Sequence, residues 1–293
     1  MRTVFGLDVR SLAVCRILLG LTWLADLFAR ILNLKAHYTD AGVFPRGPLI
    51  ADFVPRQYFS LFFINGSAWF AVLLFAVAMA AALAFVVGYR VRVAAAVSWA
   101  LAVSMQVRAP LTGDAGDVAL RLLLLWSLFV PMSAVWSLDA WRPGAPRPHR
   151  VHLSAGSIGL MTQMASIFFF AALLKTGKEW HGDRSAVYYA LHLDAFATGF
   201  GVWLRQFEEL GKALTVATML SEGIVVWLLF SPWWNGPLRT LVAILFIGLH
   251  ASFGLTMALG VFPFMMAAGW LLFLPEWFWE KLARRFPVDG VFT

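Results

Sequence analysis

The side chain best suited to acid–base chemistry is that of Lys175, which directly follows the apolar run SIFFFAALL. Burial at the end of an apolar helix disfavours the charged form of a lysine, so its amine can act as a base near neutral pH. The positive charge of Lys178, three residues later, would favour the neutral amine further. In the more common alternative, both lysines extend from a helix end to the lipid headgroups.

Other ionisable residues lie inside apolar segments, where an ionised carboxylate costs at least about 2.5 kcal/mol. Glu222 therefore needs a proton or a partner. Three roles stay open for it: a proton relay, an ion pair with Arg16 or Arg121, and a protonated carboxyl bonded to a neighbouring helix. We favour the structural ion pair. Asp26 and Arg30 are four residues apart and can pair along their own helix without any function.

Two acids and a histidine complete the candidate residues. Asp114 and Asp117 stand at the start of an apolar segment, just before Arg121. Acids at a helix N-terminus cap the helix and interact favourably with its dipole, so capping is favoured over a metal site. His250 precedes Met257 by seven residues, and these two residue types can bind haem. A lone histidine inside a span more often bonds to a neighbouring helix, so we expect neither metal nor haem.

The elements that must position these residues are membrane helices. Of 293 residues, 61% are hydrophobic and 13% are charged, against about 45 to 50% and about 25% in soluble domains. The apolar blocks are about 20 residues long, which is the length of a helix that crosses about 30 Å of hydrocarbon. The sequence therefore excludes a soluble globular protein and predicts one all-α, polytopic membrane domain over residues 1–293, with about eight transmembrane helices. We expect spans at about Ser11–Leu32, Ala68–Val87, Val91–Val107, Val118–Trp136, Ile158–Leu174, Leu214–Phe230, Leu238–Phe253 and Val261–Leu274.

The charge distribution predicts the orientation of the bundle in the lipid bilayer. A net charge of +7 is attributed to arginines that flank the spans, and no nucleic-acid site is expected. Arginines such as Arg90, Arg92 and Arg142 gather in the even-numbered loops, which places those loops and both termini in the cytoplasm. The segment GDRSAVYYALHLDAFATGFGVWLRQ after the fifth span is then an outward-facing interfacial loop. The single cysteine, Cys15, excludes an intrachain disulfide.

Separated blocks of the chain resemble the HTTM domain (horizontally transferred transmembrane domain), whose proteins are bacterial relatives of vitamin K-dependent gamma-carboxylase. The blocks are LDVRSLAVCRILLGL, AHYTDAGVFPR, GDAGDVALRLLLLW, WSLDAW, FFFAALLKTGKEWHGDRSAVYYAL and GLHASFGLTMALGVFPFMMA. In the fifth block, Lys175 and Trp180 have the spacing of the carboxylase's catalytic lysine and a following tryptophan. His250 and Glu222 match a histidine and an acid of the carboxylase.

The resemblance implies a reaction and its partners. In the carboxylase, oxygenation of vitamin K hydroquinone produces a strong base that removes a proton from a peptide glutamate, and CO2 then adds to the carbanion. The resemblance thus implies that Lys175 deprotonates a reduced vitamin K or menaquinol-type quinone, with Lys178, Trp180, Glu222, His250, Asp114 and Asp117 as candidate supporting residues. It also implies O2 and CO2 as co-substrates, a secreted peptide as substrate, and the bacterial inner membrane as location.

The chain departs from the carboxylase at two places, and these departures motivate an alternative. The carboxylase has a long lumenal C-terminal part, whereas this sequence ends soon after its last predicted span. The carboxylase also has an Asn-His pair where this chain reads GDAGD. The alternative is a non-catalytic accessory factor for the maturation or export of a secreted peptide. A transporter that uses Glu222 as proton relay is a third hypothesis, less favoured because the sequence lacks inverted halves.

Overall fold

The computed structural model describes residues 1–55, 57–145 and 148–285. Most of these residues are helical, and the two short strands pair in an antiparallel sheet that joins Leu7 to His152 and Asp8 to Val151. The prediction of an all-α fold is therefore confirmed.

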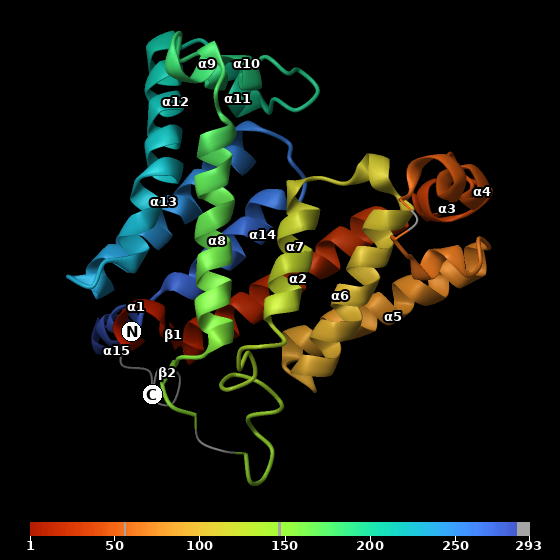
Figure 1. Ribbon diagram of the computed structural model, residues 1–293, viewed down its shortest axis with the longest axis horizontal. Coiled ribbons are helices and arrows are strands. Elements are labelled where there is room, and N and C mark those ends of the chain that lie inside the picture. The colour runs from red at the N-terminus through yellow and green to blue at the C-terminus, as the bar shows by residue number, and fades with distance from the viewer. Residues whose placement is uncertain (56, 146–147, 286–293) are drawn as a thin grey trace. The chain divides into compact units, whose positions relative to one another are not determined.

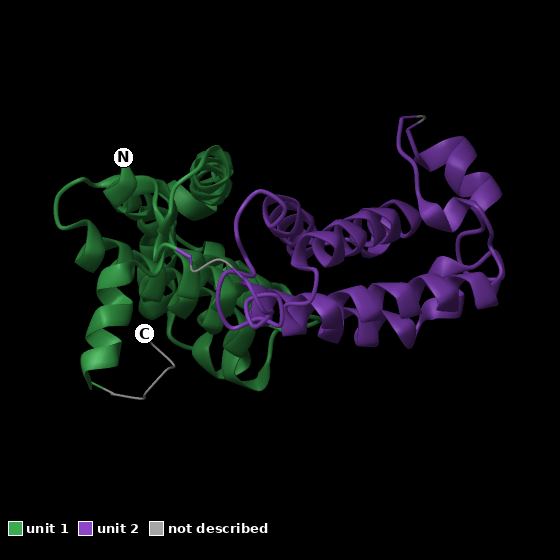
Figure 2. Ribbon diagram, turned by 90° about the horizontal axis from the view of Figure 1, so that it is seen from below, with its two compact units in different colours: residues 1–15, 149–293 green, residues 16–148 purple. Residues whose placement is uncertain are grey.

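The chain folds into two compact units, which are coloured separately in Figure 2. Unit 1 comprises residues 1–15 and 149–293, and unit 2 comprises residues 16–148. The helix α2 (Val9–Ile31) begins in unit 1 and continues in unit 2. The other elements of unit 1 are α1 (Arg2–Phe5), β1 (Leu7–Asp8), β2 (Val151–His152), α8 (Ala155–Leu174), α9 (Lys178–His181), α10 (Ala186–Leu191), α11 (Gly199–Leu204), α12 (Glu208–Gly223), η4 (Val225–Phe230), α13 (Asn235–Thr256), α14 (Phe262–Trp270), η5 (Leu271–Phe273) and α15 (Glu276–Arg285). The single membrane domain that the sequence predicts stays a prediction.

Within unit 1, long helices pack around an aromatic core. Figure 1 shows α8 alongside α12, with the short helices α9, α10 and α11 gathered at one end of both. The rings of Phe246 on α13 and Trp270 on α14 stack with centroids 4.0 Å apart. Phe168 of α8 contacts both rings, at 4.8 Å and 5.0 Å. This core fixes α8 against α13 and α14, and thereby fixes the end of α8 where Lys175 lies.

Unit 2 contains a helical hairpin, a shorter helix that packs on it and the C-terminal part of α2. Its elements are the rest of α2, α3 (Leu34–Tyr38), α4 (Arg46–Pro48), η1 (Leu49–Phe53), η2 (Leu61–Phe63), α5 (Ala68–Val87), α6 (Val91–Arg108), η3 (Pro110–Thr112) and α7 (Ala115–Trp126). α5 packs on α6, and α6 packs on α7. The rings of Tyr38, Phe62 and Phe75 form a buried cluster that ties α3 and η2 to the hairpin.

Five helices in the described part of the chain are long and apolar enough to cross a membrane, which is the pattern of a multi-pass membrane protein. They are Val9–Ile31, Ala68–Val87, Ala155–Leu174, Glu208–Phe230 and Asn235–Thr256. The predicted count of eight is not confirmed. The segment Phe262–Phe273 is apolar but shorter.

The predicted fourth span, Val118–Trp136, is wrong at its C-terminal end. The helix α7 stops at Trp126, and turns follow it as far as Trp141. Pro131 in these turns lacks the backbone N–H that a continuing helix would need. A helix of 12 residues is about 18 Å long, which is shorter than the hydrocarbon core of about 30 Å. The Ser127 hydroxyl donates to the Leu123 carbonyl at 2.7 Å at this helix end.

The turn between α5 and α6 requires glycine. Gly88 has φ +77°, and a Cβ atom there would lie 2.7 Å from Cα of Ser137 and would collide with the guanidinium of Arg16. We expect Gly88→Ala to lower the free energy of unfolding by about 1 to 3 kcal/mol, because alanine is strained at positive φ and has no room. Thermal unfolding in detergent measures the effect. Gly248→Ala in α13 is the control, because a Cβ there meets no atom within 4 Å among the described residues. Equal stability of both variants would contradict the prediction.

Candidate functional site

Lys175 lies at the C-terminal end of α8 and reaches across to α12. Its Nζ donates a hydrogen bond to the Glu222 carboxylate, and the two residues form an ion pair. The same Nζ lies 3.4 Å from the Ala171 carbonyl oxygen, one turn back along α8. The two side chains are only 17% and 8% exposed, so the pair is largely removed from solvent. The packing of α8 on α12 therefore joins two ionisable groups that are 47 residues apart.

The segment after Lys175 folds back over this pair. The helix ends at Leu174, and α9 then begins at Lys178. This turn places the Trp180 ring with its centroid 5.0 Å from Nζ of Lys175, within the range of a cation–π interaction. Nε2 of His181 lies 2.7 Å from the Lys175 carbonyl oxygen and holds the turn in place. Lys178, by contrast, is exposed.

The hydrogen bond between Lys175 and Glu222 defines what the site can do chemically. Two buried charges lose much hydration, and their attraction offsets only part of that cost. Transfer of the proton from the ammonium to the carboxylate converts the ion pair into a neutral, hydrogen-bonded pair, which removes this cost. The hydrogen bond thus gives a route for a proton between the amine and the carboxylate.

The partner of Glu222 is thus a lysine rather than an arginine. Arg16 donates instead to the Trp136 carbonyl at 2.5 Å, and Arg121 donates to Oε1 of Gln106 at 3.3 Å. His250 is buried in the core of unit 1, where its Nδ1 lies 2.7 Å from the Phe246 carbonyl. The bond lies within α13, so this nitrogen of His250 contacts its own helix.

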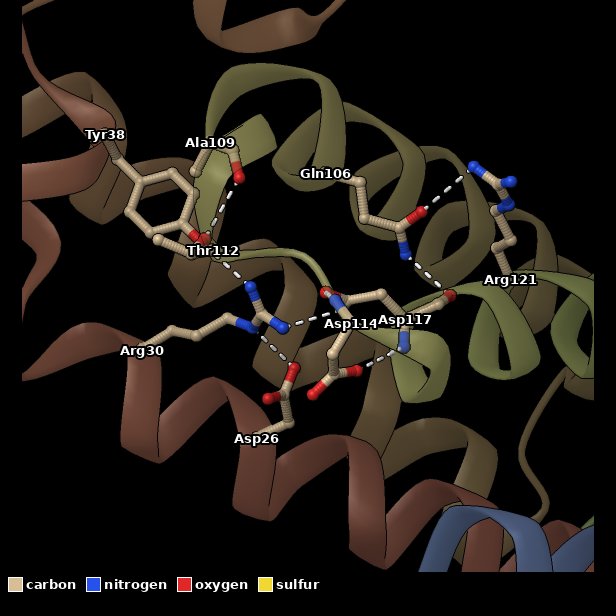
Figure 3. Close-up of polar contacts among 9 residues, drawn as sticks. All are labelled: Asp26, Arg30, Tyr38, Gln106, Ala109, Thr112, Asp114, Asp117 and Arg121. Carbon is tan, nitrogen blue, oxygen red and sulfur yellow. Dashed lines mark hydrogen bonds and ion pairs between the residues drawn. The ribbon is translucent and has the colours of Figure 1, made fainter. Parts of the chain in front are cut away.

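Unit 2 holds a second set of candidate residues, which is drawn in Figure 3. Nε of Arg30 donates to Asp26 at 2.6 Å, one turn earlier in α2. Nη2 of the same guanidinium donates to Asp117 of α7 at 2.6 Å, and Nη1 lies 3.3 Å from the Tyr38 hydroxyl. Arg30 thereby joins α2, α3 and α7, and two largely buried carboxylates share one cation.

Asp114 and Asp117 act as a helix cap. The Asp114 side chain accepts a hydrogen bond from the Asp117 N–H at 3.0 Å, and the Asp117 side chain accepts one from the Asp114 N–H at 3.2 Å. Nε2 of Gln106 donates to the Asp117 carbonyl at 2.8 Å (Figure 3). Within the ranges that the structure describes, no group of three His, Cys, Asp or Glu side chains is placed to hold a metal ion.

Sequence reasoning missed the long-range partners in both sets. The ion pair of Arg30 with Asp117 joins residues that are 87 positions apart. Tyr38 contacts the same guanidinium, and Gln106 donates to the Asp117 carbonyl. The charged residues inside apolar segments were the available signal, because each requires a partner. Their spacing along the sequence does not identify that partner, except where it lies one helical turn away.

Comparison with protein-family models identifies the family to which the chain belongs. The model of the HTTM domain matches residues 6–277, which include both sets of candidate residues. No curated protein and no solved structure matches the chain. Because the family model covers nearly the whole sequence, the chain belongs to the HTTM family.

Proposed function

We propose that this protein is a membrane enzyme of the vitamin K-dependent carboxylase type, which acts on a lipid-soluble reduced quinone with O2. The observation that carries the proposal is the largely buried pair of Lys175 and Glu222, whose amine lies 5.0 Å from the centroid of the Trp180 ring. Lys175 is the base, and Glu222 holds the proton that the amine releases. The protein would work in a bacterial inner membrane, with the segment after Lys175 on the extracytoplasmic side.

The residues around Lys175 suit an aromatic diol as substrate. A neutral Nζ can accept the proton of a quinol hydroxyl, and the face of Trp180 stabilises the ammonium that results. Leu173, Leu174 and Ile224, which are neighbours of the pair in sequence, are exposed apolar side chains. They give a lipid-borne ligand an apolar surface at the C-terminal ends of α8 and α12. A reduced quinone would supply the oxygenation chemistry, with CO2 as the second co-substrate if carboxylation is retained.

The test is turnover by the purified protein in lipid nanodiscs. Menaquinol is supplied under air and under argon, and its loss and products are followed by chromatography and mass spectrometry. A photoreactive menaquinol analogue then identifies the binding site by crosslinking. We expect oxygen-dependent conversion and crosslinks to the ends of α8 and α12. Absence of both oxygen-dependent conversion and these crosslinks would show that the proposal is wrong.

A non-catalytic accessory role is the second candidate. Asp114 and Asp117 cap α7, and Asp117 also binds Arg30. Both acids therefore have structural partners, and they do not replace the Asn-His pair that the carboxylase has in this region. This observation favours the accessory role. In that role the protein would bind a secreted peptide or its processing machinery. Crosslinking in cells followed by purification distinguishes the two. A stable protein partner without quinol turnover favours the accessory role, and turnover without a partner counts against it.

A further inference from the structure

A cavity of about 320 Å³ opens in unit 1 at the start of α13. The cavity lies between α1, the sheet and the first residues of α13 and α15, and Lys175 is not in its wall. Its wall includes the charged and polar residues Arg2, Asp8, Asn235, Arg239 and Glu276, and the aromatic ring of Trp277.

Arg239 is the residue in this wall that most needs a ligand. It is only 1% exposed, and its Nη1 donates to the Gly6 carbonyl at 2.9 Å. Its Nε and Nη2 are buried without a hydrogen-bond partner among the described residues. A buried charged donor without a partner is strongly destabilising, so an acceptor is expected at these two atoms.

The geometry of these two nitrogens of Arg239 indicates which kind of acceptor they bind. Nε and Nη2 form one edge of the guanidinium, and this edge binds two oxygens of a carboxylate or phosphate at once. Arg10 shows this arrangement nearby, because its Nε and Nη2 hold the two Asp8 oxygens at 2.9 Å and 2.8 Å. The Asp8 oxygens are bonded to Arg10, so Asp8 acts on Arg239 through its charge only, and the Nε and Nη2 edge of Arg239 has no hydrogen-bond acceptor among the described residues.

The N-terminus of α13 also favours a negatively charged ligand in the cavity. No described side chain caps the N-terminus of α13, and the N-terminus of a helix favours anions. Arg2 adds a second, exposed guanidinium to the wall. Asp8 and Glu276 are the two opposing charges in the wall; Asp8 is ion-paired with Arg10, and Glu276 lies in the first turn of α15.

The residues next to the cavity are of the types that occur at the level of lipid headgroups. Trp233 and Trp234, directly before α13, are 78% and 81% exposed, as in the aromatic belt at a membrane surface. The helix α15 begins at the cavity and carries exposed Lys281, Arg284 and Arg285 beside the buried Trp279, the pattern of an interfacial helix. Basic pockets at helix ends on such a surface bind phosphate headgroups.

We propose that this cavity binds the phosphate of a phospholipid headgroup, with the Nε and Nη2 edge of Arg239 as its bidentate donor. The acyl chains then extend along the apolar surface of unit 1. The site is independent of Lys175 and of the proposed turnover.

The experiment uses delipidated, purified full-length protein. Phosphatidylglycerol is titrated while binding is followed by native mass spectrometry and thermal unfolding. Diacylglycerol provides the matched lipid without phosphate, and glycerol phosphate provides the phosphate without acyl chains. We expect only phosphatidylglycerol to bind and to raise the unfolding temperature. Equal stabilisation by diacylglycerol, or by glycerol phosphate at the same concentration, would overturn the assignment to a phospholipid headgroup.

Two variants locate the site. Arg239→Lys keeps the charge but removes the two-nitrogen edge, and we expect its affinity for phosphatidylglycerol to fall about tenfold or more. Thr3→Trp fills the cavity from its exposed rim and leaves Arg239 intact, so it keeps the proposal testable if Arg239→Lys does not fold. Arg285→Gln is the control, an exposed arginine of α15 outside the wall. Unchanged lipid affinity in the variants that fold would overturn the proposal.

Discussion

Replacement of Lys175 by alanine is expected to lower the oxygen-dependent turnover of reduced quinone by about 10²- to 10⁴-fold, the range of a lost general base. The physical reason is that, among the described residues, Lys175 supplies the amine that is paired with Glu222 and contacts the Trp180 ring. The measurement is kcat in lipid nanodiscs at saturating quinol. Lys178→Ala is the matched control, because this lysine is exposed three residues away, and we expect it to retain turnover.

A stability effect must be separated from this loss of catalysis. Lys175→Ala leaves the Glu222 carboxylate without its cation, and the removal of one partner of a buried pair is destabilising. The double variant with Lys175→Met and Glu222→Leu removes both charges and should regain stability without regaining activity. Turnover in Lys175→Ala that equals the Lys178→Ala control would exclude Lys175 as the base.

Replacement of Glu222 is expected to change the pH dependence of quinol turnover. Glu222→Gln retains a hydrogen-bond acceptor for Lys175 but cannot take up its proton. We therefore expect kcat to fall while the KM for quinol stays similar, and the pH–rate profile to lose the limb that reports this acid. Glu222→Asp keeps the carboxylate and should recover part of kcat. A purely structural role for Glu222 would leave the shape of the pH profile unchanged.

The bounds of α8, the helix that ends just before Lys175, are predicted well from the sequence, because the signals for them are local. The apolar block predicts Ile158–Leu174, and α8 runs over Ala155–Leu174. The three additional residues form its N-terminal turn, where Ser154 and Ser157 cap each other. At the other end, Lys175 and Gly177 follow the last apolar residue, as expected for the end of a span.

The local relations among charged residues are also readable from the sequence, whereas the tertiary ones are not. Asp26 and Arg30 pair one turn apart, and Asp114 and Asp117 cap α7. The ion pairs of Glu222 and Asp117 depend on which helices pack together. Hydropathy alone also places the end of α7 ten residues too late, because the turns after Trp126 are as apolar as the helix.

Replacement of Arg30 by methionine is expected to lower the free energy of unfolding by about 3 to 5 kcal/mol, the cost of removing one partner from a buried pair. Asp26 and Asp117, whose side chains are 10% and 6% exposed, would both lose their cation. They would also repel each other across the space that the guanidinium fills. Equilibrium unfolding in mixed detergent measures the loss, with the fraction of native helix as the signal.

An exposed pair of the same type in unit 2 provides the control. Arg46 and Asp40 form an ion pair at 2.7 Å with side chains 27% and 40% exposed, and exposed pairs contribute about 0 to 1 kcal/mol. Arg46→Met should therefore have a much smaller effect than Arg30→Met. Adding Asp26→Asn and Asp117→Asn to Arg30→Met removes the unpaired charges and should restore a large part of the stability. If Arg30→Met costs no more than Arg46→Met, the Arg30 network does not hold α2 and α7 together, and the buried charges have another role.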